Sequence, residues 1–369
     1  MTIREIQWHP YRLPLRNSFT TAHNVLAVRE GAIVEVITDE GLTGIGEIAP
    51  LPEFGGETLA IALSALPDLT ARLRRLPIKQ ALAQISTWVE AGTIPSSTAC
   101  GLESALFDAL GKLEGRSVGA LLTRGNDAPS LPCPAIAVNA VIGAATTEDA
   151  AALARQFVKA GFGCIKLKMG CEIAEEIERV AAVREAIGPE IDLRLDANEG
   201  WNFVQAHTLL TACSRYNIQY VEQPLQAHDL AGMRRLRYAV PIPLAADEGL
   251  RNLASARRIL AEEAASIFII KPQLVGGFQV SQQIIREAAA HGVQSVVTSA
   301  IESGIGLAGA LHLVAASPEV TLACGLATLH LLADDLLVDD LPIHNGTITV
   351  PVGLGLGVKL DREALAYYR

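Results

Sequence analysis

The sequence predicts an α/β protein: a (β/α)8 barrel preceded by an N-terminal α+β domain. Strand-like apolar runs alternate with helical segments from Pro132 onward, the pattern of a parallel sheet. Charged residues end these runs at steps of 30, 26, 25 and 24 residues, about one strand–helix unit each, at Lys166, Asp196, Glu222, Asp247 and Lys271. The chain has 369 residues, 50% of them hydrophobic, which is enough for a barrel and a smaller domain.

In the first 125 residues, strand-like segments are followed by helix-like segments, a pattern that predicts the α+β domain. Ile33–Thr38 is typical of a strand, Asp39–Gly41 of a turn, and Gly44–Ile48 of the next strand in a small antiparallel sheet. Residues 58 to about 125 are rich in alanine and leucine at helical spacing. We therefore expect a layer of helices beside this sheet.

Two irregular loops, at residues 18–25 and 50–57, flank the predicted sheet. Each mixes aromatic, glycine and polar residues, among them Phe19 and Phe54. Such loops suit contact with a ligand, and ordinary connections between strands fit the same composition equally well.

The barrel strands are expected in the apolar runs that follow. Helix signals separate these runs: Thr147–Asp149 places capping and acidic residues at a helix start, and Gly188–Pro189 ends another helix. Eight strand–helix units starting at Ala135 would close a barrel. In chain order, the expected strands cover 135–141, 165–169, 192–198, 219–222, 244–247, 267–271, 296–299 and 322–326.

Composition narrows the class of protein. The net charge of −10 argues against nucleic acid as the main partner. No apolar run reaches the roughly 20 residues of a membrane span, and the N-terminus has no signal-peptide pattern. The six cysteines form no Cys-x-x-Cys pair, so we expect buried free thiols in a reducing cytoplasm.

Three acidic residues, Asp196, Glu222 and Asp247, end three successive predicted strands. Side by side they would repel one another unless a cation lay between them. Oxygen ligands on rigid strand ends suit Mg²⁺, and Asn198 and Glu248 are plausible partners behind them. Solvated carboxylates at helix starts would explain any one of these acids, but they explain three in register poorly.

Lysines flank the acids. Lys166 and Lys168 share one face of the second predicted strand, and Lys271 ends the sixth, on the opposite side of the barrel rim. Surface exposure is the usual interpretation of a lysine, but the apolar neighbours of these three indicate buried strands. Adjacent ammonium groups lower each other's pKa, which would make a lysine usable as a base near neutral pH.

A divalent metal facing opposed lysines suits one reaction type. The metal would bind a substrate carboxylate, a lysine would remove the adjacent α-proton, and the metal would stabilise the resulting enediolate. This combination of lysine and Mg²⁺ is already described for the enolase superfamily.

The chain resembles the muconate-lactonising subgroup of that superfamily nearly end to end. The resemblance implies that Asp196, Glu222 and Asp247 bind Mg²⁺, for which Mn²⁺ could substitute. It implies that Lys168 is the acid/base catalyst, Lys166 the neighbour that tunes it, and Lys271 the opposing lysine. The matching segments are Gly46-Glu47 with Pro50-Leu51-Pro52, Lys166-Leu167-Lys168, Asp196-Ala197-Asn198, Val221-Glu222-Gln223-Pro224, Ala246-Asp247-Glu248 and Lys271-Pro272.

Within the subgroup, the loops and the tail are most similar to o-succinylbenzoate synthases. Dipeptide epimerases usually carry Asp-x-Asp at the end of the eighth strand, where this chain has Cys324-Gly325-Leu326-Ala327-Thr328. The resemblance therefore implies dehydration of a cyclohexadiene carboxylate to o-succinylbenzoate. N-acylamino acid racemase, then dipeptide epimerase or muconate cycloisomerase, remain as alternatives, as does a barrel reused for binding. The expected substrate-binding residues are Phe19, Phe54, Ser299 and Glu302.

The resemblance also implies how the chain is divided. An α+β capping domain would span residues 1–125, and a modified barrel 132–335. Residues 336–369 would form a C-terminal segment that returns to complete the capping domain. The expected partner is a small-molecule carboxylate, with no nucleic acid and no membrane, and the sequence leaves the oligomeric state open.

Overall fold

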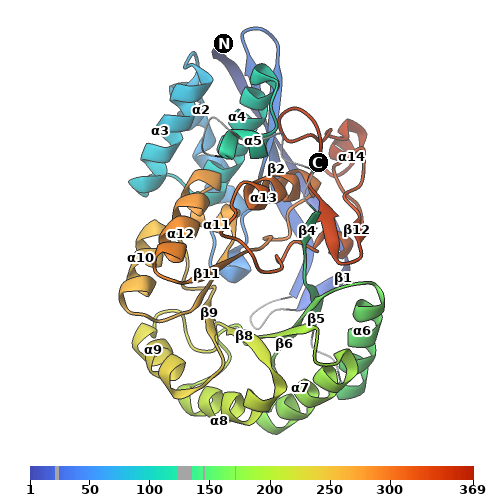
Figure 1. The fold of residues 1–369 in the computed structure, drawn as a ribbon. Helices are drawn as coiled ribbons and strands as arrows, with labels where there is room; N and C mark the ends of the chain where they lie inside the picture. The colour runs from blue at the N-terminus through green and yellow to red at the C-terminus, as the bar shows by residue number, and fades with distance from the viewer. Residues whose placement is uncertain (21–24, 124–134, 144–145, 171) are drawn as a thin grey trace.

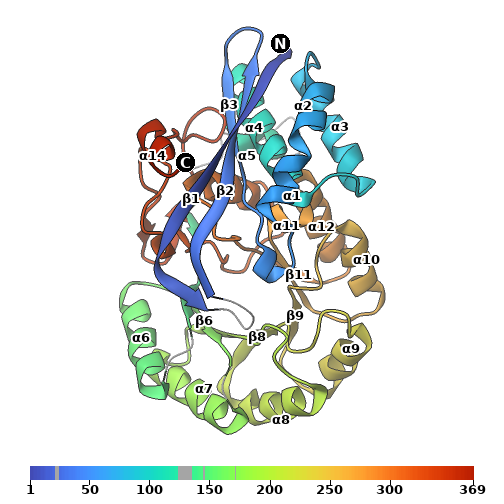
Figure 2. The same ribbon diagram turned by 180° about the vertical axis from the view of Figure 1, so that it is seen from behind.

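The computed structural model describes residues 1–20, 25–123, 135–143, 146–170 and 172–369, with only the backbone described for Ser18–Thr20 and Val25. Its strands form a three-stranded antiparallel sheet, a seven-stranded parallel sheet and a small three-stranded sheet. In Figures 1 and 2 the helices of the barrel form an arc outside the parallel strands, and the N-terminal sheet and helices lie at one end. The predicted fold class is confirmed.

The N-terminal sheet consists of β1 (Ile3–Thr20), β2 (Val25–Thr38) and β3 (Thr43–Ile48), paired antiparallel in that order. Helix α4 (Ser96–Glu114) packs directly on β3, because Gly44 and Gly46 of the strand have no side chain to hold the helix away. A Cβ atom at Gly44 would lie 2.1 Å from the carbonyl oxygen of Ala105, so no larger residue fits there. The other helices of this part are α1 (Leu59–Ser64), α2 (Leu66–Leu73), α3 (Ile78–Glu90) and α5 (Val118–Leu122).

Seven parallel strands form the barrel sheet in strict chain order. Each is followed by a helix on the outside, as the alternating pattern predicts. The strands are β5 (Ala140–Ile142), β6 (Cys164–Lys168), β7 (Asp192–Asp196), β8 (Ile218–Glu222), β9 (Leu244–Ala246), β10 (Ile267–Ile270) and β11 (Gln294–Val297). The helices are α6 (Thr147–Lys159), α7 (Ile173–Ile187), α8 (Phe203–Cys213), α9 (Leu230–Ala239), α10 (Leu253–Ala261), α11 (Pro272–Val275) with α12 (Phe278–Ala290), and α13 (Gly304–Ala315).

The eighth unit differs from the prediction of a complete strand–helix pair. Segment 322–326 closes the barrel through isolated bridges, from Cys324 to Val138 on one side and from Gly325 to Thr298 on the other. Within the described part of the chain, no barrel helix follows it. The 3₁₀ turn η3 (Leu329–Leu331) comes next, and Ala333 N then donates to Pro14 O of β1. The chain leaves the barrel here because its next backbone partners belong to the N-terminal sheet.

The predicted strand 135–141 is two strands. Its first part, β4 (Ala135–Ala137), pairs with β13 (Thr347–Thr349), and only β5 joins the barrel sheet. Between them Asn139 N donates to Cys324 O, so the chain changes partner at this point. A continuous apolar pattern cannot reveal a change of pairing partner.

The C-terminal segment contacts both parts of the molecule. Strand β12 (Ile343–His344) pairs with β13, which reaches the barrel through β4. Helix α14 (Arg362–Tyr367) lies against the N-terminal sheet, where Arg362 pairs with Glu35 and Arg12 N donates to Tyr368 O. The proposed boundaries near 125–132 and 335 stay predictions.

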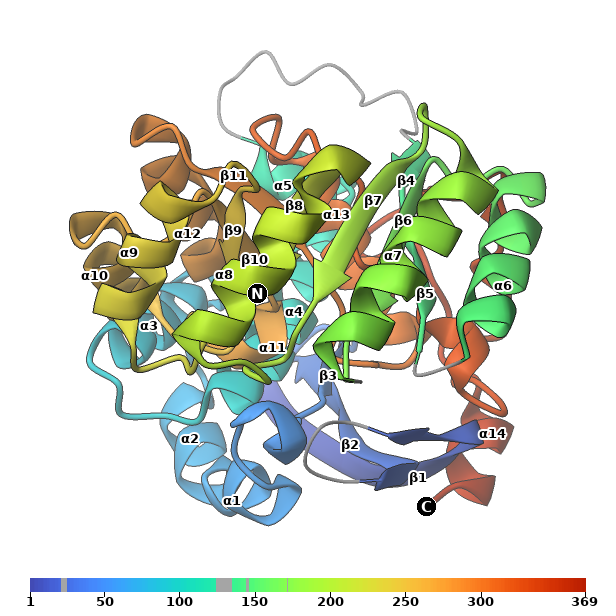
Figure 3. The ribbon, with the colours of Figure 1, turned by 90° about the horizontal axis from the view of Figure 1, so that it is seen from below.

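Figure 3 shows where the two parts meet. The arrowhead of β7 points toward the side on which β1, β2 and β3 lie, so the carboxyl ends of the barrel strands face the N-terminal sheet. One apolar cluster runs through both parts. Among the described residues, no helix is long and apolar enough to cross a membrane.

Candidate active site

The predicted site residues meet at the rim formed by the carboxyl ends of β6 to β10. In the parallel register, Lys168 is paired with Asp196 and Asp196 with Glu222, so these three strand ends are level. Asp247 follows β9 directly, and Lys271 follows β10. The strands therefore bring together all six residues predicted as metal ligands or lysine catalysts. Lys166 is included, since it lies two residues before Lys168 and on the same face of the strand.

Lysine ammonium groups lie between the buried carboxylates. The side chains of Asp196, Glu222 and Asp247 are at most 4% exposed. Lys166 Nζ lies 2.7 Å from Asp196 Oδ2 and 2.6 Å from Glu222 Oε1, so the two carboxylates converge on one cationic point. Lys271 pairs with Asp247. The positive charge that these acids require is supplied here by lysines.

Lys168 has two acceptors at the rim. Its Nζ donates to Asp196 Oδ2 and to Asn198 Oδ1, each at 2.7 Å. Asn198 lies beyond the end of β7 with φ +42, so the predicted strand 192–198 is two residues too long. Asn198 reaches Lys168 through this left-handed turn, not through the alternation of a strand.

Burial and charge set the ionisation of these groups. Burial lowers the pKa of Lys166, but Asp196 and Glu222 outweigh it and hold that pKa well above its usual range. The predicted lowering by a neighbouring ammonium is therefore not what governs Lys166. Burial, then repulsion from Asp196, raises the pKa of Glu222 to about 8. For Asp196, Lys166 and Lys168 overcome the effect of burial and lower the pKa well below its usual range.

Glu248, predicted to support the metal ligands, contacts Asn198 next to the rim, and its predicted role stays a prediction. Its Oε1 accepts a hydrogen bond of 3.0 Å from Asn198 Nδ2. Its Oε2 is buried and has no hydrogen-bond partner among the described residues. Burial, then the charge of Asp247, raises the pKa of Glu248 to about 7. This unsatisfied acceptor at the rim calls for a further donor or a cation.

The donor set fits a hard divalent cation. It consists of carboxylate oxygens on consecutive strand ends, with the buried Glu248 oxygen beside them. Within the described residues, no three His, Cys, Asp or Glu side chains are already arranged around a common point as in a metal site. Binding would therefore require the lysine ion pairs of Asp196, Glu222 and Asp247 to rearrange.

Phe54 is the predicted substrate-binding residue that the structure places over the lysines. It ends the 3₁₀ turn η1 (Pro52–Phe54), and its ring centroid lies 5.8 Å from Lys168 Nζ and 5.2 Å from Lys271 Nζ. The loop 50–57 thus reaches the mouth of the barrel. The backbone of Phe19 lies in β1, opposite Leu26, and its side chain is outside the described part of the chain.

Ser299 and Glu302, also predicted to contact substrate, lie in the loop after β11. They are 6% and 2% exposed, and Ser299 Oγ donates to Glu302 Oε2. Thr328 Oγ1 donates to Ser299 Oγ at 3.0 Å. These contacts hold the loop itself, and a contact with substrate stays a prediction.

Several residues of the site region carry roles that the sequence did not assign. Gln223 Oε1 accepts from Asp247 N at 3.0 Å and so fixes the backbone of a predicted metal ligand. Arg194, inside the barrel, donates to Gln219 Oε1, Asn139 Oδ1 and Ala323 O. Both residues lie next to motif residues in the sequence, but these hydrogen-bond partners lie at least 24 positions away in the chain.

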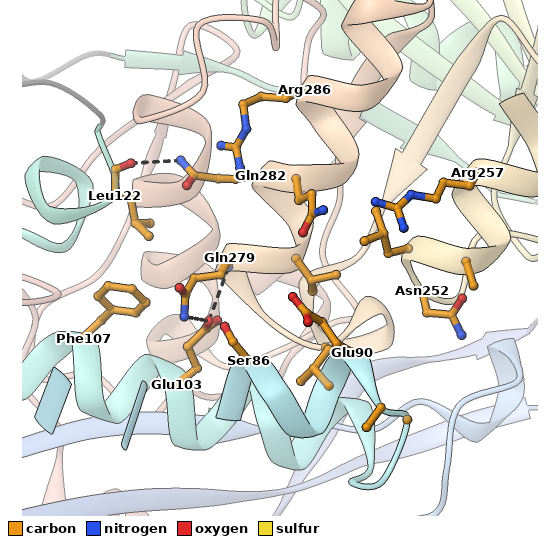
Figure 4. A pocket seen from close by; sticks show the side chains of 18 of the residues that line it. Ser86, Glu90, Glu103, Phe107, Leu122, Asn252, Arg257, Gln279, Gln282 and Arg286 are labelled. Carbon is orange, nitrogen blue, oxygen red and sulfur yellow. Dashed lines mark hydrogen bonds between the residues drawn. The ribbon is translucent and has the colours of Figure 1, made fainter. Parts of the chain in front are cut away.

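A cavity away from the rim lies between helices α3, α4 and α5 of the N-terminal part and helices α10 and α12 of the barrel. It encloses about 730 Å³, and none of the predicted site residues lines it. Figure 4 shows Glu103 of α4 facing Gln279 of α12 in this cavity. Glu103 Oε1 accepts from Gln279 Nε2 at 2.8 Å, which ties the two parts together.

The fold and the site define an α/β-barrel protein whose rim carries three buried carboxylates, each paired with a lysine, on the side that faces the N-terminal sheet. Comparison with known families agrees: residues 149–364 match the enolase C-terminal domain-like family, and residues 3–108 match the MenC N-terminal domain. The chain belongs to the enolase superfamily.

Similar proteins in this superfamily catalyse different reactions. N-succinyl-L-Arg/Lys racemase of Bacillus cereus is 29% identical over 99% of this chain and 97% of its own length. Its crystal structure superposes with a TM-score of 0.91 at 27% identity, covering 100% of this chain and 98% of that chain. o-Succinylbenzoate synthase of Thermobifida fusca is 38% identical over 57% of this chain and 65% of its own length.

A further solved structure contains a metal. It is the dipeptide epimerase from Enterococcus faecalis complexed with Mg and the dipeptide L-Leu-L-Tyr. It superposes with a TM-score of 0.89 at 26% identity, over 97% of this chain and 99% of that chain.

Proposed function

We propose that this protein is an o-succinylbenzoate synthase. It would remove a proton alpha to a carboxylate and dehydrate 2-succinyl-6-hydroxy-2,4-cyclohexadiene-1-carboxylate to o-succinylbenzoate, a step toward menaquinone or phylloquinone. The observation that carries proton abstraction is the placement of Lys168 and Lys271 around Phe54, beside three buried carboxylates. The match of residues 3–108 to the MenC N-terminal domain supports the synthase among the reactions of the superfamily.

Asp196, Glu222 and Asp247 would hold Mg²⁺, with Asn198 and Glu248 behind them. When bound, the metal supplies positive charge for the substrate carboxylate and for the anion that forms when the α-proton leaves. Lys166, between Asp196 and Glu222, adds a further positive charge.

The lysines would divide the remaining work. Lys168 Nζ accepts the ring proton alpha to the carboxylate, and the C–H electron pair enters the enediolate. The same lysine then returns the proton to the departing hydroxyl group, so that water leaves and the ring becomes aromatic. Lys271 stabilises the negative charge from the other side and transfers no proton.

N-succinylamino acid racemase is the second candidate, because the Bacillus cereus racemase matches this chain over nearly its whole length. That reaction would use both Lys168 and Lys271 as bases on opposite faces of the α-carbon. A dipeptide epimerase is less well supported, because the end of the eighth barrel segment, Cys324–Thr328, holds no carboxylate for a substrate ammonium.

The deciding experiment compares substrates in one enzyme preparation. Steady-state kcat/KM is measured for the cyclohexadiene substrate and for a panel of N-succinylamino acids and dipeptides. Solvent deuterium exchange at the α-carbon is followed in parallel. Fast dehydration beside slow or absent exchange would support the synthase. Rapid exchange with inversion, at a kcat/KM equal to or above that for dehydration, would overturn it in favour of the racemase.

A further inference from the structure

We infer that Arg29 is a positioning residue, which holds the Phe54 loop over Lys168 and Lys271 by tying it to the barrel rim. Arg29 lies on β2, and its side chain is 2% exposed. Its guanidinium contacts two segments that approach the site from different parts of the molecule. The inference rests on the proposed function only for the roles given to the two lysines.

In the N-terminal part, Arg29 donates hydrogen bonds to the backbone just before the Phe54 turn. Nη2 donates to Ala49 O at 2.6 Å, and Nη1 donates to Pro50 O at 2.7 Å. Leu51 comes next, and its carbonyl accepts from Phe54 N at 3.1 Å to close the turn. Arg29 therefore fixes the base of the turn that carries the Phe54 ring.

In the barrel, Arg29 donates hydrogen bonds to the loop after β11. Its Nε donates to Ala300 O at 3.2 Å and to Ile301 O at 3.0 Å. Ile301 has φ +61, a conformation that a β-branched residue rarely adopts. Such a conformation persists only where the surroundings hold it. The shared donor from Arg29 supplies part of that restraint, together with Ser299 Oγ, which accepts from Ile301 N.

Only an arginine can make this set of contacts. It has five N–H donors in a planar fork, whereas a lysine has a single ammonium centre. Among the described residues, the acceptors of the Arg29 side chain are all backbone carbonyls, the fifth being Glu30 O. A side chain that served only to neutralise a carboxylate would not be used in this way.

The same backbone is held from the opposite side by Gln273, two residues after Lys271. Gln273 Oε1 accepts from Ala49 N at 3.0 Å, and Nε2 donates to Glu47 O at 2.9 Å. The end of β3 is thus fixed between Arg29 and helix α11, which begins directly after Lys271. This places the Phe54 turn in a constant position relative to that lysine.

The first test needs no substrate. Hydrogen–deuterium exchange is measured on the full-length protein as wild type, Arg29→Met and Arg29→Lys. The exposed Arg12→Met on the neighbouring strand β1 is the control. In both Arg29 variants, peptides that cover 51–57 and 299–303 should exchange at least about ten times faster, whereas peptides of β7 and β8 should be unchanged. Arg12→Met should match the wild type throughout.

The second test asks whether Arg29 acts through Phe54. In the wild-type background, Arg29→Lys should lower kcat/KM by about 10- to 100-fold, mainly through KM, because the loop is misplaced. In a Phe54→Ala background the same change should cost less than about twofold. The two substitutions would then be non-additive for kcat/KM.

Either of two results would overturn the inference. One is exchange in both Arg29 variants that is unchanged at 51–57 and 299–303, or that rises equally over all of β1, β2 and β3. The other is full additivity of the Arg29 and Phe54 effects on kcat/KM. If the synthase assignment fails while the exchange pattern appears, the proposed function is wrong and the positioning role of Arg29 stands. The kinetic cycle then uses whichever substrate of the panel is turned over.

Discussion

At the scale of single residues, the site is a set of buried charges that compensate one another. Lys166 lies between Asp196 and Glu222, and this contact favours its ammonium form over the amine. Of the three predicted metal ligands, Lys168 contacts only Asp196. Its second hydrogen-bond acceptor is the neutral Asn198. Lys168 therefore contacts one carboxylate where Lys166 contacts two, and Lys168 is the lysine to which we assign proton transfer.

Replacing the lysines one at a time should distinguish the residue that transfers the proton from the residue that supplies only positive charge. Lys168→Ala removes the only base of a one-base dehydration, so kcat should fall by about 10²–10⁴-fold or more. Lys271→Arg keeps the positive charge but cannot accept a proton near neutral pH. Steady-state kinetics of a synthase should therefore retain measurable dehydration in Lys271→Arg.

The exposed Lys79→Ala on α3 is the matched control and should behave as wild type. A racemase would lose turnover in at least one direction with Lys271→Arg. Dehydration that disappears in Lys271→Arg, in a variant that still folds and binds substrate, would contradict the one-base assignment.

At the scale of elements, α13 is fixed to the rest of the molecule through a buried histidine. His312 Nδ1 accepts from Gly119 N of α5 at 3.2 Å, and its Nε2 lies 3.0 Å from Leu356 O. The neutral ring with its proton on Nε2 satisfies both partners. Burial lowers the pKa of His312 to about 4, although Leu356 O acts in the opposite direction. Helix α13 follows the rim loop, so this contact also supports the site.

The lowered pKa of His312 predicts a loss of stability in acid. The unfolded chain takes up the proton near pH 6.5 and the folded chain only near pH 4, so the contribution is complete above pH 6.5 and declines below it. The loss should reach on the order of 3 kcal/mol by about pH 4. His312→Gln can accept and donate similarly without titrating.

Urea unfolding at pH 7.5, 6.5, 5.5 and 4.5 measures the difference in unfolding free energy between wild type and His312→Gln. That difference should shift against the wild type as the pH falls, while carboxylate titrations common to both proteins cancel. A difference that is constant over this range would show that His312 is not held neutral.

At the scale of the whole molecule, residues of the N-terminal part and residues of the barrel meet at the predicted site. The Phe54 turn, Arg29 and Glu47 belong to the N-terminal part, and the lysines and acids to the barrel. Glu47 Oε2 accepts from Gly306 N at 2.8 Å and from Ser303 Oγ, so a residue of the capping sheet caps the barrel helix α13. Separation of the two parts would therefore remove contacts on both sides of the site.

Metal binding should stabilise the whole molecule. Mg²⁺ added to chelator-treated protein should raise the thermal midpoint, because a ligand at 100 times its Kd stabilises the folded state by about 2.7 kcal/mol. The chelated enzyme should be inactive, and Mg²⁺ or Mn²⁺ should restore turnover.

Asp196→Asn should lose most of this shift, since an amide is a poorer ligand for a hard cation. Asp68→Asn, at an exposed position of α2, should keep it. Full activity of protein shown by elemental analysis to be free of metal would remove the basis for a metal at the rim.

The sequence by itself determined the barrel and the chemical groups at its rim. Apolar runs at regular spacing require buried parallel strands, and a polar residue that ends such a run must lie at the carboxyl edge of the sheet. For this reason the sequence predicts that Lys166, Asp196, Glu222, Asp247 and Lys271 lie together.

Only the tertiary structure decided how these groups are held. The partner change between β4 and β5, the missing helix after 322–326 and the short β7 all depend on backbone hydrogen bonds between distant segments. Arg29 is the clearest case, because within the described part of the chain every acceptor of its side chain is a backbone carbonyl. Every residue type has that carbonyl, so the amino-acid sequence carries no signal of which ones an arginine will reach until the chain has folded.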